Sequence, residues 1–143
     1  MNAIQLTEQQ QEKKELLAQI SEKHLEWKEK RQLNSRWDGS LTITTIVLTL
    51  FTAILGTDGI SINENAKNAL IAILSGSVIA IQSVGNAFPV KQRAGGYRAI
   101  ESQAWSLKSR VGFLQADAEI SENLPKIQEQ FYELVSKSAE LEI

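Results

Sequence analysis

The fold is decided by residues 39–90, which read GSLTITTIVLTLFTAILGTDGISINENAKNALIAILSGSVIAIQSVGNAFPV. This stretch holds two charge-free apolar segments, residues 39–57 and 68–90, separated by a short polar loop. As helices they would be roughly 28 and 34 Å long, enough to cross a hydrocarbon core of about 30 Å. We therefore predict an all-α protein built on a two-span transmembrane helical hairpin.

A buried helix pair inside a soluble core is the alternative explanation of these two segments. The composition is compatible with it, since 43% of the residues are hydrophobic. Core helices are usually shorter, however, and carry a charge on an exposed edge. The lack of any charge in two long neighbouring segments favours the membrane.

Composition excludes several function classes. Outside the hairpin, a chain of 143 residues leaves too little for a separate globular enzyme domain. A net charge of −2 argues against a nucleic-acid partner, and the lack of cysteine excludes disulfide and thiol chemistry. No carboxylate pair, metal-ligand spacing or phosphate-binding loop is present, and the single histidine, His24, fits helix packing. We expect no catalytic residue, no cofactor and no metal.

Basic residues predict the orientation of the hairpin. They lie before the first segment and after the second: Lys28, Lys30, Arg31, Arg36, Lys91, Arg93 and Arg98. The loop between the segments carries only one basic residue, Lys67. The positive-inside rule then places both termini in the cytoplasm, in an inner or plasma membrane. Arg36, Lys91, Arg93 and Arg98 would meet anionic lipid at the membrane surface.

The remaining residues form two cytoplasmic parts, an N-terminal helix (1–38) and a helical tail (91–143). A capping-box pattern at Thr7–Gln10 predicts a helix start near Glu8, and a break is expected at residues 115–123. Residues at alternating steps of three and four form three stripes: Leu17, Ile20, His24, Trp27; Tyr97, Ile100, Ala104, Leu107, Val111, Leu114; Leu124, Ile127, Phe131, Leu134, Ser138, Leu141. Packed together, the stripes predict a cytoplasmic three-helix bundle.

The junction between hairpin and tail contains two backbone signals. Pro89 should kink or end the second span, because proline cannot continue a helix normally. Gly95 and Gly96 follow within a few residues and predict a hinge at the inner membrane surface.

Threonines mark one face of the first span. Thr42, Thr45, Thr49 and Thr52 recur at steps of three and four and so share that face. Their hydroxyls could bond the carbonyls one turn earlier while the face packs on another helix. Alternatively, they could line a water-filled path, which makes them the pore-lining candidates.

The second span has a small-residue face and a polar stripe. The small residues Ala69, Gly76, Ala80, Ser83 and Ala87 would allow close contact with span one or with a neighbouring subunit. Gln82 and Asn86 lie on the adjacent stripe. Since unpaired carboxamides are costly in a membrane, they must bond between helices or face water.

The order of these parts resembles the SLATT superfamily, which has a cytoplasmic helix, two spans with a short loop, and a cytoplasmic helical tail. The local match is at residues 88–101, FPVKQRAGGYRAIE, where an aromatic residue ends span two and Tyr97-Arg98 opens the tail helix. The resemblance covers nearly the whole chain. It implies an oligomeric, pore-forming membrane effector, of a kind often linked to nucleotide-signalled defence, and it brings no catalytic residues.

Two function hypotheses remain. Two spans cannot enclose a polar path alone, so the first is a homo-oligomeric membrane channel or pore that conducts ions. The second is a membrane-anchored scaffold that recruits a soluble cytoplasmic protein partner through its helices. The direction of the threonine face would separate the two hypotheses.

Overall fold

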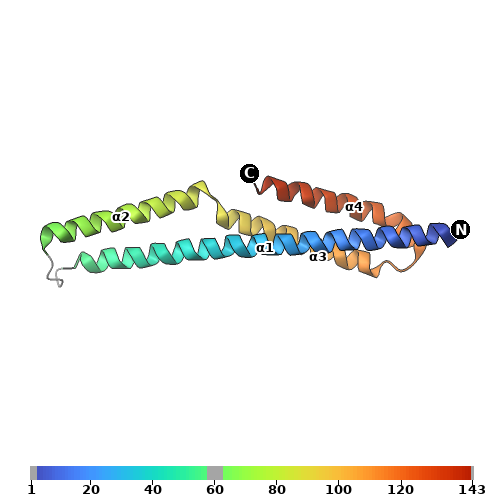
Figure 1. The fold of residues 1–143 in the computed structure, drawn as a ribbon, viewed down its shortest axis with the longest axis horizontal. Coiled ribbons are helices and arrows are strands. Elements are labelled where there is room, and N and C mark those ends of the chain that lie inside the picture. Colours follow the sequence, from blue (N-terminus) through green and yellow to red (C-terminus); the bar gives the residue numbers. More distant parts are fainter. Residues whose placement is uncertain (1–2, 58–62, 143) are drawn as a thin grey trace. The chain divides into compact units, whose positions relative to one another are not determined.

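The computed structural model describes residues 3–57 and 63–142, without the side chains of residues 3–7 and 117. The described residues form four α-helices and no strand (Figure 1). The helices are α1 (Ala3–Leu55), α2 (Glu64–Ala87), α3 (Val90–Phe113) and α4 (Asp117–Glu140). The all-α prediction is confirmed. Contacts divide the chain into two units, which we call the bundle unit (Met1–Gln32 with Arg93–Ile143) and the hairpin unit (Leu33–Gln92).

The first helix is longer than the sequence pattern suggested. It begins at Ala3, upstream of the capping-box pattern at Thr7, so the predicted helix start near Glu8 is wrong. The residues around Thr7 have helical neighbours on both sides, and helix formation continues across them. The helix also continues through Gly39, since one glycine costs only about 1 kcal/mol and no proline interrupts the segment.

In the bundle unit, α1, α3 and α4 share one hydrophobic core. The core residues are Leu16, Ile20, Trp27, Tyr97, Ile100, Ala104, Leu107, Val111, Ile120, Leu124, Ile127, Phe131 and Leu134. The rings of Trp27 and Phe131 lie 6.3 Å apart at 52°, the tilted arrangement that aromatic pairs prefer. Every stripe predicted from the sequence contributes to this core, with Leu17, Leu114 and Leu141 packed at its margin.

Charged contacts surround the bundle core. Arg31 of α1 pairs with Glu101 of α3 at 2.7 Å. Lys30 pairs with Glu26 at 2.6 Å and also with Glu142, beyond the end of α4. The Glu142 and Glu26 carboxylates raise the pKa of Lys30, and the Lys23 and Lys30 ammonium groups lower the pKa of Glu26. These pairs are partly exposed, so each contributes at most about 1 kcal/mol to the free energy of unfolding.

The last helix corrects the break expected at residues 115–123. α4 begins at Asp117 and holds Pro125 within it, on its exposed side. Ile120, which the predicted stripe left out, is fully buried. Burying an isoleucine side chain contributes roughly 1.5–3 kcal/mol, which offsets much of the ~3 kcal/mol that an interior proline costs.

The hairpin unit consists of the second half of α1 and α2, which lies beside it (Figure 1). Half-buried residues recur at steps of three and four on both helices and form the contact between them, which we call the seam. The seam comprises Leu41, Thr45, Leu48, Thr52 and Leu55 on α1 and Ile71, Leu74, Val78, Ile81 and Gly85 on α2.

Away from the seam, large apolar side chains of the hairpin are exposed. Ile43, Phe51, Ile73 and Ile79 are each 57–64% exposed. Both span helices are long and apolar enough to cross a membrane, and no residue in their most apolar 18-residue windows is buried. The core helix of a soluble protein is mostly buried, and within the described residues these two helices are not.

Local signals set the ends of α2. Asn63 caps its start, because the side-chain oxygen accepts a hydrogen bond from the Asn65 backbone N–H at 2.9 Å. At the other end Phe88 is extended, with φ −116° and ψ 93°, as expected before Pro89. Residues 58–62 of the polar loop predicted between the two segments lie outside the described residues.

The glycine pair after Pro89 lies within α3, so the chain bends at Phe88-Pro89 and both glycines are helical. A Cβ atom at Gly95 would meet nothing within 4 Å, whereas one at Gly96 would lie 2.7 Å from Cδ1 of Leu141. Gly96 therefore allows the end of α4 to approach α3 closely.

Phe131 tests the bundle core. Phe131→Ala should lower the free energy of unfolding by about 3–5 kcal/mol, because the ring is 3% exposed and contacts Trp27. Phe113→Ala is the matched control, since that ring is 80% exposed and the change should cost under about 0.5 kcal/mol. Denaturant unfolding in detergent measures both variants, and equal losses would contradict the assignment of this core.

The two glycines give a second matched pair. Gly95→Ala should stabilise the protein by about 0.5–1 kcal/mol, because alanine favours the helix and the site is open. Gly96→Ala should lose that gain or destabilise, because its methyl group would collide with Leu141. Thermal unfolding compares the two, and the same shift for both would rule out close packing at Gly96.

Candidate functional site

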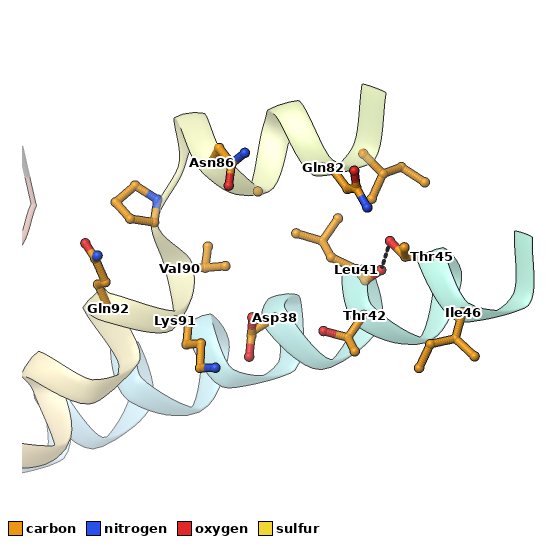
Figure 2. A pocket seen from close by; sticks show the side chains of 13 residues that line it. Asp38, Leu41, Thr42, Thr45, Ile46, Gln82, Asn86, Val90, Lys91 and Gln92 are labelled. Carbon is orange, nitrogen blue, oxygen red and sulfur yellow. Dashed lines mark hydrogen bonds between the residues drawn. The ribbon is translucent and has the colours of Figure 1, made fainter. Parts of the chain in front are cut away.

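An open groove of about 580 Å³ lies within the hairpin unit, between α1 and the end of α2 (Figure 2). It is lined by Asp38, Leu41, Thr42, Thr45, Ile46, Ile81, Gln82, Gly85, Asn86, Pro89, Val90, Lys91 and Gln92. Its volume is in the range of small-molecule sites. Its lining combines apolar side chains, hydroxyl and carboxamide groups, and the charged side chains of Asp38 and Lys91.

The groove exists because the seam lacks a side chain at its end. Gly85 takes the seam position that continues from Val78 and Ile81, and a Cβ atom there would meet nothing within 4 Å. The two helices are therefore separated by open space at this position instead of packed apolar side chains. The groove occupies this gap.

Polar groups from both helices meet in the groove. Thr42 of α1 and Gln82 and Asn86 of α2 line it together (Figure 2). Within the described part of the chain, their side chains make no hydrogen bond. Residues seven apart share a helix face, so Thr49 and Ser75 continue the same side of the hairpin. We call this set (Thr42, Thr49, Ser75, Gln82, Asn86) the polar flank.

The four threonines of span one do not act as one face. Thr45 and Thr52 are half-buried in the seam, while Thr42 and Thr49 are exposed beside it. Thr45 donates a hydrogen bond to the carbonyl oxygen of Leu41 at 2.9 Å, as drawn in Figure 2. Thr49 and Thr52 likewise donate to the carbonyls of Thr45 and Leu48, both at 2.8 Å. A hydroxyl that donates to its own helix keeps its lone pairs for water or a cation.

The small-residue face of α2 is separate from the groove and from the seam. Gly76, Ala80 and Ser83 are exposed, and a Cβ atom at Gly76 would meet nothing within 4 Å. Ser83 donates to the carbonyl of Ile79 at 2.8 Å. Of the two contacts expected for this face, the one with span one is therefore wrong, because the seam uses the opposite side of α2.

The other predicted site residues are dispersed. Pro89 and Lys91 line the groove, and Lys91 lies in the first turn of α3. Arg36 is exposed on α1. Arg93, Gly95, Gly96 and Arg98 lie farther along α3, in the bundle unit. The groove therefore contains one of the four predicted surface cations.

Sequence reasoning missed Asp38 as a groove residue. Its position three residues before Leu41 places it on the seam side of α1. The three-residue spacing between Asp38 and Leu41 was the sequence signal that could have identified it. Gln92 was also missed, because its position depends on the bend at Phe88-Pro89.

The arrangement offers solvation rather than reaction chemistry. Hydroxyl and carboxamide oxygens can replace water around an ion, and neutral groups do so without holding it tightly. The described residues contain no group of three His, Cys, Asp or Glu side chains that could hold a metal ion.

Comparison with known proteins does not place the chain in a family. No family model matches it, and neither the curated proteins nor the solved structures provide a match.

Proposed function

We propose that this protein is a homo-oligomeric membrane pore. In this proposal the hairpin unit spans an inner or plasma membrane, and the bundle unit and both termini are cytoplasmic. The polar flanks of several copies surround one water-filled path, and the apolar surfaces face lipid.

The observation that carries the proposal is the convergence of polar groups from both helices on one side of the hairpin. Thr42, Gln82 and Asn86 line one groove and make no hydrogen bond within the described chain. Polar groups without partners are costly in hydrocarbon, so in a membrane they must face water or another copy. One hairpin cannot surround a path, and both requirements are met if several copies turn this side inward.

The exposed apolar surface supports the membrane part of the proposal. Side chains such as Ile43, Leu50 and Phe51 of α1 and Ile73 and Ile79 of α2 are more than half exposed. In water so much contiguous apolar surface would drive aggregation, whereas lipid would cover it. The seven basic residues that flank the spans support cytoplasmic termini.

Orientation is tested with single cysteines, which the natural chain lacks. An impermeant thiol reagent added to intact cells should label Ser61→Cys but not Ser136→Cys, because the loop would be outside and the tail inside. Permeabilised cells, in which both should react, provide the control. Labelling of position 136 alone in intact cells would refute the orientation.

Conduction is tested by filling the groove. Purified, assembled protein in planar bilayers should carry current, and Gly85→Leu should reduce its conductance several-fold, since the added side chain would enter the open space at position 85. Gly95→Leu is the matched control, because that site is equally open but lies in the bundle unit.

Two results would count against this function. A protein that remains monomeric in detergent and in nanodiscs could not enclose a path. Assembled wild-type protein that carries no current over a wide voltage range would favour a function without conduction.

A membrane-anchored scaffold is the second candidate, favoured by aromatic residues on the bundle surface. Trp105 and Phe113 of α3 are 63% and 80% exposed. Exposed aromatic side chains are typical of protein interfaces, so this side of α3 could recruit a soluble partner. Loss of partner binding in Trp105→Ala, with wild-type assembly and no conductance in either protein, would support the scaffold.

A further inference from the structure

The groove ends in two opposite charges. Asp38 of α1 and Lys91 of α3 lie at the same end of it (Figure 2). They are the only charged side chains among its described lining residues. Neither forms an ion pair with the other or with another described residue. In the bundle unit, by contrast, Arg31 and Glu101 approach to 2.7 Å, as do Lys23 and Glu26.

Beyond these charges the polar flank is neutral. Thr42, Asn86 and Gln82 follow along the groove, and the sequence has no charge in residues 39–57 or 68–90. Neutral oxygen and amide groups favour neither cations nor anions strongly. The sign of a conducted ion would therefore be determined where the formal charges lie, at the end of the flank.

We propose that Asp38 and Lys91 form the charge filter of the pore, an inference that rests on the proposed function. Each copy would bring one carboxylate and one ammonium group to the same mouth. Their potentials oppose each other, so the wild-type pore discriminates weakly between K⁺ and Cl⁻. Removing one charge leaves the other uncompensated, and the mouth then concentrates the counter-ion of the charge that remains.

The test is the reversal potential across a KCl gradient in planar bilayers. Wild type should reverse near zero. Asp38→Asn should shift the reversal toward the chloride equilibrium potential, and Lys91→Gln should shift it toward the potassium value. The double variant should return close to wild type. Because ions screen surface charge over about 10 Å at 0.1 M salt and about 3 Å at 1 M, both shifts should shrink at high salt.

Matched controls remove one carboxylate and one ammonium group outside the hairpin unit. Glu129→Gln and Lys126→Gln change exposed residues of α4 in the bundle unit and should leave the reversal potential unchanged. All variants are first checked for wild-type assembly and membrane insertion, so that a selectivity change is compared among equal assemblies.

The outcomes separate this inference from the proposed function. If current persists and neither Asp38→Asn nor Lys91→Gln moves the reversal potential, the charge filter is wrong and the path is lined by another surface, while conduction by the assembled protein stands. A Thr42→Cys variant adds a second measurement, because a hydrophilic thiol reagent should block current only if the groove faces the path. The absence of current from assembled wild type would overturn the pore and the filter together.

Discussion

The decisive constraint on this molecule is that each helix of the hairpin buries only one of its sides against the other helix. Their seam covers a single row on α1 and a single row on α2, and the remaining apolar side chains stay exposed. A soluble monomer does not tolerate so large an apolar surface, whereas hydrocarbon does not tolerate unpaired polar groups. If the hairpin lies in a membrane, as proposed, both conditions apply to the same two helices and limit which of their sides can face lipid.

The bundle unit obeys the ordinary rules of a water-soluble core. Three helices bury complementary stripes, an aromatic pair links α1 to α4, and ion pairs remain at the margin. The hairpin unit has no such core, and the polar side chains of Thr42, Gln82 and Asn86 line one flank of it. The boundary between these two kinds of packing lies within α1, after Gln32, where neither proline nor a change of helix marks it.

Much of the helical architecture could be predicted from periodicity. The spacing of Ile100, Leu107, Phe131 and Leu134 indicated their burial, because a heptad-like apolar stripe is removed from water when it packs against another helix. The end of α2 was also predictable, because proline restricts the residue before it and lacks a backbone donor. The buried stripes depend on a repeated spacing of three and four residues, and the end of α2 depends on adjacent residues, so both can be read from the sequence.

Properties that depend on a partner helix were not predictable from one helix alone. Steps of three and four place Thr42, Thr45, Thr49 and Thr52 within one broad sector, but the seam divides that sector into a contact row and a free row. The sequence of α2 alone could not show whether Gly85 packs against α1 or leaves a gap, because that depends on the facing surface of α1. Gln82 and Thr42 lie 40 positions apart in sequence, and only the hairpin register brings them to one groove.

The contact between Gly96 and Leu141 has an evolutionary consequence. The space above position 96 is occupied by the end of the Leu141 side chain, so a larger residue at 96 would require that side chain to move. In related sequences, we expect a residue larger than glycine at 96 to occur more often with a shorter residue at 141. The two positions would therefore be expected to covary, and this pairing could help to align distant relatives whose spans have diverged.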